Sequence, residues 1–207
     1  MRRAEFPDDD EELDERGRRE VGLAAARIAA ADGHTGPPGT DTGGIAGARI
    51  AAATDADAPY RPAPPAALCG PALSCRQTAA GLGLVPVVDH GLRDRDAGHW
   101  TGRSLAEIQE RDPEGLMAWL TDPAATPHGG ESVLTLIDRV AAWLRGLPGR
   151  ASGKVVAVTH PDVIRAALVH VLAAPPDTFW RLDTEPLAQL SLTARDGRWR
   201  LRLSRPV

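Results

Sequence analysis

The chain has 207 residues, a formal net charge of −4 at pH 7 and a pI near 5.9. This length suffices for one sizeable α/β domain and is short for two domains joined by a long linker. The acidic balance argues against binding to nucleic acid or to an anionic membrane, since either needs clustered Lys and Arg. No run reaches the roughly 18 apolar residues of a membrane span, so we expect no membrane association.

The N-terminal segment changes character at about residue 13. Residues 1–13 are charged and include five consecutive acidic residues at 8–12, which favours a solvated tail or the lead-in to a helix. From Leu13 to Ile28 apolar residues recur at helical spacing, and the pattern predicts a helix that ends near Asp32. We therefore expect the folded domain to cover residues 14–207.

Residues 33–65 interrupt the domain. They are rich in Gly, Pro, Ala and Thr and poor in large apolar side chains. Such a segment cannot bury enough surface to offset the entropy that ordering costs. We interpret it as a flexible insertion.

Short apolar runs alternate with amphipathic patterns after the insertion. Strands are predicted at 66–69, 85–88, 155–158, 187–193 and 199–203, and helices at 73–82, 104–111, 113–120, 132–147 and 161–172. Ser104 and Glu107 form a capping-box pattern at the start of the second of these helices. Strands that alternate with helices predict a three-layer α/β/α fold with a mostly parallel central sheet.

The two cysteines, Cys69 and Cys75, flank a predicted strand-to-helix turn. Neither a Cys-x-x-Cys motif nor a histidine at metal-ligand spacing accompanies them. We therefore expect two reduced thiols, no metal or other cofactor, and a cytoplasmic location.

The segment 154–172 is the most informative part of the chain. A strand buried on both faces, 155–158, ends at Thr159 and His160, and Pro161 then fits the first turn of an amphipathic helix. Anions bind where a parallel strand meets a helix N-terminus, because unpaired N–H groups and the helix dipole favour negative charge there. The pattern alone leaves open whether His160 is an anion ligand or merely ends a strand.

Several segments in fixed order resemble the histidine phosphatase superfamily, which has the phosphoglycerate-mutase-like fold. Residues 13–29 are similar to the family's first helix, and PALSCRQTA at 71–79 is similar to its Ser-Pro-x-x-Arg-Ala-x-Gln-Thr-Ala stretch. LRDRDAGHWTG at 92–102, HGGES at 128–132 and VVAVTHPDVIRAAL at 155–168 resemble three later motifs. The resemblance runs from about Leu13 to the C-terminus and implies the family's three-layer fold.

The resemblance also implies a chemistry. In the family, the histidine of an Arg-His-Gly motif attacks a phosphomonoester to form a phosphohistidine, while arginines and a second histidine hold the phosphoryl oxygens and a carboxylic acid protonates the leaving oxygen. His160 takes the place of the second histidine and Asp94 that of the acid, so these two are the candidate catalytic residues. For Asp94, a loop carboxylate paired with Arg93 or Arg95 stays an alternative.

The candidate substrate-binding residues are Ser74, Arg76, Glu131 and His160. Ser74 stands where the family has a clamp arginine, and Arg76, about 200° further round the helix, is expected to point away from the pocket. A serine offers one neutral hydrogen bond in place of a charged fork, and loss of one transition-state donor typically costs about 2.7–4 kcal/mol.

Two positions next to His160 depart from the family pattern, and two positions in the motif of Asp94 are expected to be structural. Pro161 and Asp162 stand where the family has two glycines, which removes one backbone N–H and brings a carboxylate to the anion site. Trp100 and Gly102 are expected to be packing and turn residues.

The family's nucleophile motif is not apparent in the chain, because no Arg-His-Gly occurs in it. His34 follows the first helix with no strand before it, and the remaining histidines are interpreted as loop or helix-surface residues (His90, His99, His128 and His170). The family's first strand, which pairs beside 155–158, is also not apparent. Either residues 45–53 fill its place, or the edge is open, or the start codon lies upstream; we favour the last, which in-frame translation upstream of Met1 would test.

The resemblance thus implies a histidine phosphatase family protein that hydrolyses phosphomonoesters or transfers phosphoryl groups, with an activity that these departures weaken or abolish. The alternatives are a non-catalytic pseudophosphatase that binds a phosphate ligand or a partner, and a scaffold without a ligand. The expected ligand is a small phosphorylated molecule or inorganic phosphate. The sequence sets neither the substrate nor the oligomeric state.

Overall fold

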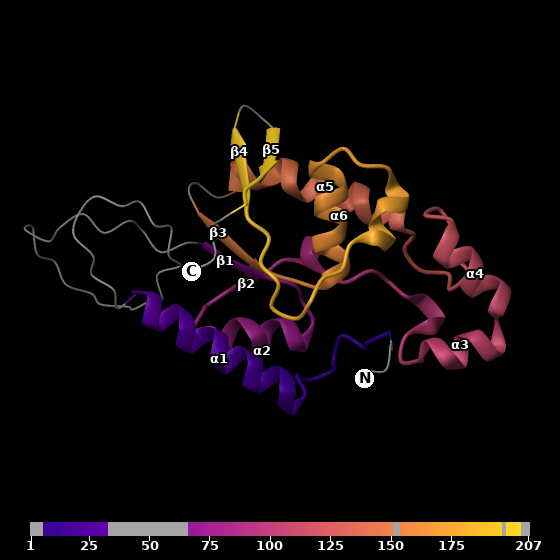
Figure 1. Ribbon diagram of the computed structural model, residues 1–207, viewed down its shortest axis with the longest axis horizontal. Helices are drawn as coiled ribbons and strands as arrows, with labels where there is room; N and C mark the ends of the chain where they lie inside the picture. The colour runs from indigo at the N-terminus through magenta and orange to yellow at the C-terminus, as the bar shows by residue number, and fades with distance from the viewer. Residues whose placement is uncertain (1–5, 33–65, 151–153, 196–197, 204–207) are drawn as a thin grey trace, which may run out of the picture.

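A parallel sheet between two helical layers organises the chain (Figure 1). The computed structural model describes residues 6–32, 66–150, 154–195 and 198–203. The helices are α1 (Glu15–Asp32), α2 (Leu73–Gly81), α3 (Leu105–Arg111), α4 (Pro113–Thr121), α5 (Val133–Arg150) and α6 (Pro161–Val171), with 3₁₀ turns at His90–Leu92, Gly98–Trp100 and Pro176–Arg181. The strands are β1 (Ala66–Cys69), β2 (Val87–Val88), β3 (Val155–Val158), β4 (Leu192–Arg195) and β5 (Arg198–Leu201).

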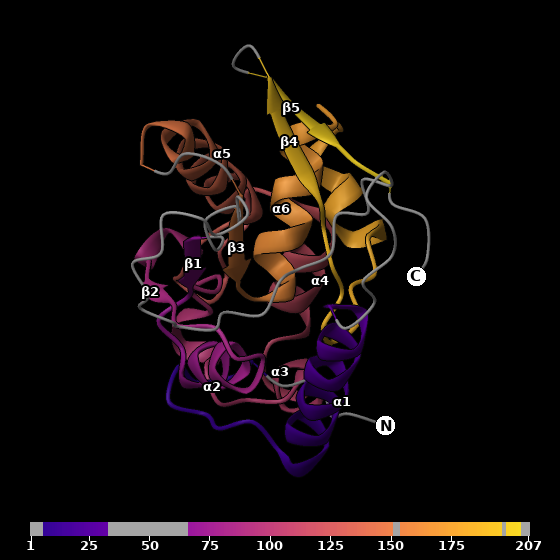
Figure 2. The same ribbon diagram turned by 90° about the vertical axis from the view of Figure 1, so that its left-hand side faces the viewer.

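The central sheet has the strand order β2-β1-β3, and all three strands are parallel. Leu68 of β1 pairs with Val87 of β2 on one side and with Ala157 of β3 on the other. β4 and β5 form a separate antiparallel pair, which Figure 2 shows beside α6 and apart from the sheet. The predicted α/β fold with a mostly parallel central sheet is confirmed.

The two helical layers lie on opposite faces of this sheet. Figures 1 and 2 show α1 and α2 on one face and α5 and α6 on the other. Leu136, Val140 and Leu144 recur every four residues along α5 and are buried, as is expected of the apolar stripe of an amphipathic helix. They form one core with Ala166 of α6 and with Phe179. No helix in the described part of the chain is long and apolar enough to cross a membrane.

Two strands begin later in the structure than the sequence predicts. The run 85–88 pairs only over Val87–Val88. The run 187–193 becomes a strand only from Leu192, because Leu187 has a φ of 60° and the Ala188 N–H donates to the Glu185 carbonyl at 3.0 Å. This backbone is a turn, and a turn cannot continue a ladder.

β3 has one paired edge. It pairs with β1, and no strand of the described ranges pairs with its other edge. Its three valines are half-buried and Ala157 is exposed, although the sequence predicts burial on both faces. An edge strand has fewer neighbours to cover it, which accounts for this exposure. Residues 45–53, one of the three explanations for the apparent lack of a first strand, lie outside the described residues.

The segment that precedes α1 connects two parts of the molecule. The Phe6 ring packs on Trp100 and Trp119 of the part of the chain that holds α3 and α4, and the Leu73 N–H at the start of α2 donates to the Asp9 carbonyl at 2.8 Å. The acidic residues at 8–12 are exposed. Residues 6–13 therefore lie against the domain at both ends, with their carboxylates in solvent.

Candidate active site

The loops that follow β1, β2 and β3 meet at the carboxyl edge of the sheet. The Gly70 N–H after β1 donates to the Val158 carbonyl at the end of β3, at 2.9 Å. A Cβ on Gly70 would lie 2.7 Å from the Leu92 carbonyl oxygen, which also accepts a hydrogen bond from Thr159 Oγ1 at 2.7 Å. This is the edge where open α/β sheets bind ligands.

Asp94 and His160 meet at this edge. His160 is the N-cap residue of α6, and its Nδ1 lies 3.2 Å from Asp94 Oδ2. Asp94 Oδ1 accepts a hydrogen bond from the Arg95 N–H at 2.8 Å, so the carboxylate is held on both sides. The other imidazole nitrogen, Nε2, is buried and has no hydrogen-bond partner among the described residues. The two predicted catalytic residues are therefore in contact, and His160 Nε2 stays available to donate or accept one hydrogen bond.

The Asp94 side chain faces His160, whereas the guanidinium groups of Arg93 and Arg95, the alternative partners that the sequence offers, contact other carboxylates. The Arg93 guanidinium lies 3.6 Å from Glu131. The Arg95 guanidinium lies 3.0 Å from Asp162.

Burial raises the pKa of Asp94, and His160 opposes this shift while the charge of Asp162 adds to it. A carboxyl with a raised pKa keeps its proton at a higher pH than an ordinary aspartate. This is the property that a general acid needs in order to protonate a leaving oxygen near neutral pH.

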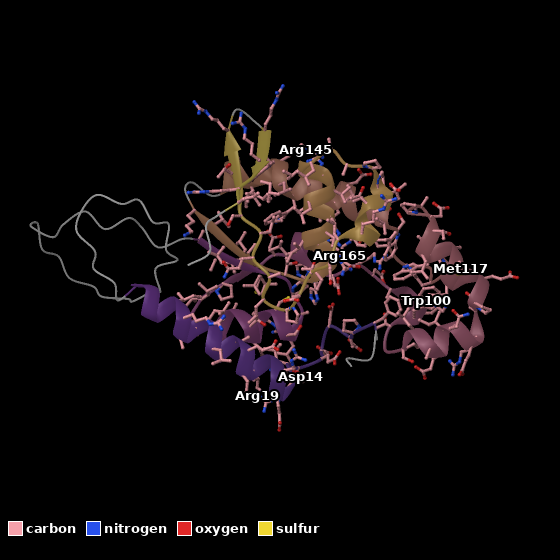
Figure 3. The ribbon with its side chains drawn as sticks, in the orientation of Figure 1. Asp14, Arg19, Trp100, Met117, Arg145 and Arg165 are labelled. Atoms are coloured by element: carbon pink, nitrogen blue, oxygen red, sulfur yellow. The ribbon has the colours of Figure 1, made fainter. Side chains whose placement is uncertain are left out.

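Arg95 and Arg165 share the carboxylate of Asp162. Each guanidinium lies 3.0 Å from one Asp162 oxygen, and Figure 3 shows Arg165 near the middle of the molecule, between α6 and the layer of α1 and α2. Arg95 Nη1 and Arg165 Nε are buried without a hydrogen-bond partner in the described ranges. The sequence predicts a carboxylate near the anion site at position 162, but it does not predict the two arginines that neutralise it.

Glu131 is held by a residue that the sequence does not single out. Its two carboxylate oxygens accept hydrogen bonds from Arg139 at 2.8 and 2.7 Å. Arg139 also donates to the carbonyl oxygens of Gly91, Arg93 and Asp94. The Glu131–Arg139 pair therefore fixes the loop that carries Asp94. The sequence indicates this pair only by a basic residue two turns into the predicted helix 132–147.

The first turn of α2 lies close to Asp94. Burial raises the pKa of Cys75 to about 12, and the charges of Asp94 and Cys69 add to the shift. The Cys75 thiol is therefore protonated at neutral pH and is no nucleophile. Ser74 beside it is half-buried, whereas Arg76 is exposed, in agreement with the rotation expected on a helix.

His128 is buried, although the sequence places it in a loop. Only 1% of its surface is exposed, its Nδ1 accepts a hydrogen bond from the Gly130 N–H at 2.9 Å, and its ring packs on Trp100 at a centroid distance of 5.2 Å. Burial, and secondarily Arg95, lowers its pKa. His128 is therefore a neutral core residue, unlike the exposed His90 and His99. No group of three or more His, Cys, Asp or Glu side chains that could hold a metal occurs in the described part of the chain.

The profile of the histidine phosphatase superfamily (branch 1) matches residues 31–205, a range that includes Asp94, Glu131 and His160. The chain belongs to the histidine phosphatase superfamily. The predicted resemblance is thus confirmed, and the Asp94–His160 contact lies in the region that the histidine phosphatase profile covers.

Two proteins from Mycobacterium tuberculosis are similar in sequence to parts of this chain. The bifunctional protein Rv2228c is 38% identical over 115 residues, which are 55% of this chain and 31% of that protein. Glucosyl-3-phosphoglycerate phosphatase is 30% identical over 128 residues, which are 56% of each. The chain thus spans about a third of the first relative and about half of the second.

A solved structure shares the fold over nearly the whole chain. The mycobacterial glucosyl-3-phosphoglycerate phosphatase Rv2419c in complex with VO3 superposes with a TM-score of 0.67 at 24% identity, over 98% of this chain and 90% of that one. The histidine phosphatase fold is therefore present in this chain.

Proposed function

We propose that this histidine phosphatase superfamily member binds the phosphoryl group of a small phosphomonoester, or inorganic phosphate, at the Asp94–His160 pair, and that it turns phosphomonoesters over weakly or not at all. The observation that carries this proposal is the buried Nε2 of His160, which lacks a partner among the described residues while Nδ1 faces Asp94. A buried polar atom without a hydrogen-bond partner lowers the stability of the fold. A ligand that supplies the missing partner explains why this position holds such an atom.

The geometry gives His160 a definite role. With a hydrogen on Nε2, the His160 imidazole can donate to a phosphoryl oxygen while Nδ1 faces the Asp94 carboxyl group. His160 also stands at the N-terminus of α6, where the helix dipole favours negative charge. Pro161 at the first helical position lacks one of the backbone N–H groups that could contribute.

Slow turnover is the second part of the proposal. Ser74 stands where the clamp arginine of the family is expected. A neutral serine hydroxyl stabilises the charge on a transferring phosphoryl group less than a guanidinium fork does. Asp94 keeps the raised pKa of a proton donor, so the site offers a phosphate contact at His160 and an acid beside it.

The alternative within the same fold is a pseudophosphatase that binds a phosphate ligand without any catalysis. The relative from Mycobacterium tuberculosis is named for the substrate glucosyl-3-phosphoglycerate, and we propose by analogy a phosphorylated small molecule as the ligand of this chain. Enzyme and pseudophosphatase share the Asp94–His160 pocket and differ only in turnover.

A binding and turnover experiment tests the proposal. We expect vanadate and inorganic phosphate to raise the melting temperature, because a ligand that binds only the folded state stabilises it by RT ln(1 + [L]/Kd). His160→Gln should abolish this shift, whereas His90→Gln, a change at an exposed histidine, should leave it intact. Hydrolysis of an aryl phosphate above background that His160→Ala removes would identify the weak enzyme, and no turnover would identify the pseudophosphatase. No melting shift with millimolar anion would contradict the proposed function.

A further inference from the structure

Two guanidinium groups converge on one carboxylate beside the proposed phosphate pocket. Asp162 Oδ2 lies 3.0 Å from Arg95 Nη2, and Asp162 Oδ1 accepts a hydrogen bond from Arg165 Nη1 at 3.0 Å. Asp162 is two residues after His160 and occupies the first turn of α6. One carboxylate therefore faces two cations at the place where an anion is proposed to bind, and it balances only one of the two positive charges.

The donors of this cluster are not all used. Arg95, whose side chain is only 6% exposed, has a buried Nη1 without a partner, and Arg165 has a buried Nε without one, both within the described part of the chain. His160 Nε2 is a third buried nitrogen without a partner among the described residues, on a side chain that contacts Asp94 next to Arg95. Arginine N–H groups can only donate, so whatever would satisfy the two guanidinium groups must be an acceptor.

The Arg95 guanidinium is held in place by aromatic rings as well as by Asp162. It lies 4.8 Å from the ring centroid of Trp119, 5.4 Å from that of Trp180 and 5.7 Å from that of Phe179. Arg165 lies 5.8 Å from the same Phe179 ring. Cation–π contacts of this kind orient a guanidinium independently of its anion, so both cations stay in position if the carboxylate leaves.

We propose that Arg95 and Arg165 form an oxyanion site that the Asp162 carboxylate of the same chain fills, and that a phosphate or carboxylate group of the ligand displaces Asp162 from it. The inference rests on the proposed function, because the site adjoins the Asp94–His160 pair. Asp162 is 18% exposed at the start of a helix, so its short side chain can rotate to solvent without unfolding α6.

The internal carboxylate competes with every external anion. Phosphate can bind between the two arginines only in molecules in which Asp162 has moved away. The apparent affinity for phosphate is therefore the intrinsic affinity multiplied by the fraction of such molecules. A ligand with two acidic groups overcomes this competition better than a monoanion, since one group can bind at His160 and the other between the arginines.

The variant Asp162→Asn tests the inference by calorimetric titration with inorganic phosphate. We expect it to bind phosphate at least about fivefold more tightly than the wild type. We also expect a lower melting temperature than the wild type in phosphate-free buffer and a larger rise when phosphate is added. Asp177→Asn is the matched control, because it removes an exposed ion pair with Arg181 and should change neither quantity.

Each outcome separates the two proposals. Equal phosphate affinity in the wild type and in Asp162→Asn would overturn the internal-anion inference and leave the proposed function standing. A lack of phosphate binding by both proteins would contradict the proposed function itself. If the tighter binding of Asp162→Asn disappears in Asp162→Asn/Arg165→Gln, the guanidinium of Arg165 is confirmed as a ligand.

A second variant covers the case in which Asp162→Asn does not melt cooperatively without phosphate. Arg165→Gln keeps the Arg95–Asp162 pair and removes one cation of the site. We expect it to weaken phosphate binding at least about fivefold. Unchanged affinity in this variant would overturn the inference.

Discussion

Some side chains near the site have structural roles that the sequence around them does not predict. Asp94 and His160 could be chosen from the sequence because both lie in motifs that resemble those of a known family. Arg139 and His128 could not, because their importance comes from burial and from partners distant in the chain. No local pattern encodes a contact between residues 139 and 91, which only the packing of α5 against the loop creates.

The first prediction concerns His128 and pH. Its pKa is lowered from 6.5 in the folded state, so the unfolded state binds more protons as the pH falls through and below 6.5. The free energy of unfolding therefore decreases over this range, and protonation also destroys the acceptor that Nδ1 offers to Gly130. Urea unfolding between pH 7 and pH 5 should show a smaller loss of stability for His128→Gln than for the wild type.

His90→Gln is the control for this measurement, because His90 is exposed. Asp94 titrates with the opposite sign, since its raised pKa makes the folded state bind more protons, but it is present in all three proteins. An identical pH dependence in His128→Gln and the wild type would mean that folding does not lower the pKa of His128, and it would contradict the burial assigned to this side chain.

The second prediction concerns the Glu131–Arg139 pair. Removal of Arg139 leaves the buried Glu131 carboxylate with only the longer 3.6 Å contact to the exposed Arg93, and it frees the carbonyl groups of the loop that carries Asp94. Breaking a buried pair in this way typically costs about 3–5 kcal/mol, so Arg139→Ala should lower the free energy of unfolding in urea by an amount of that order. Arg181→Ala, which removes an exposed pair, should have little effect. Equal effects of the two substitutions would contradict the role assigned to Arg139.

At the scale of elements, short sequence patterns were sufficient to predict some helix and strand boundaries. The strand at 66–69 and the capping box of α3 are confirmed as predicted, and Ser104 and Glu107 form the reciprocal hydrogen bonds. The strand predicted at 187–193 is wrong over residues 187–191, because an apolar composition hides the left-handed backbone of Leu187. Gly70 shows a similar limit of prediction. The sequence predicts a turn after the strand at 66–69, but it does not predict how closely this turn approaches the Leu92 carbonyl.

The third prediction compares two glycines with positive φ. Gly98 has a φ of 51°, and a Cβ there would overlap the His128 carbonyl, whereas Gly102 has a φ of 74° and a Cβ there would meet nothing within 4 Å. Both substitutions by alanine introduce backbone strain, but only Gly98→Ala also pushes the two loops apart. Gly98→Ala should therefore lower the melting temperature more than Gly102→Ala. A larger effect at Gly102 would contradict the packing of these loops.

At the scale of the whole molecule, the sequence predicted the layers and the parallel sheet, and it singled out 155–158 as the strand whose neighbour is not apparent, but it did not predict how exposed that strand is among the described residues. Alternation of strands and helices fixes the class of fold. The position of a strand within a sheet depends on long-range pairing, which is why a run that reads as fully buried, Val155–Val158, has an exposed Ala157. The site is nevertheless complete enough at the carboxyl edge of this sheet to bring Asp94 and His160 together.

The central claim is that His160 Nε2 is the contact point for a phosphoryl oxygen. The most direct test is ¹⁵N NMR of the histidine side chains of the full chain during titration with inorganic phosphate. We predict a saturable shift of the His160 Nε2 resonance, with no comparable change at the exposed His90 and His99. A His160 signal that stays unchanged up to millimolar phosphate, or that shifts no more than those of the exposed histidines, would contradict the account.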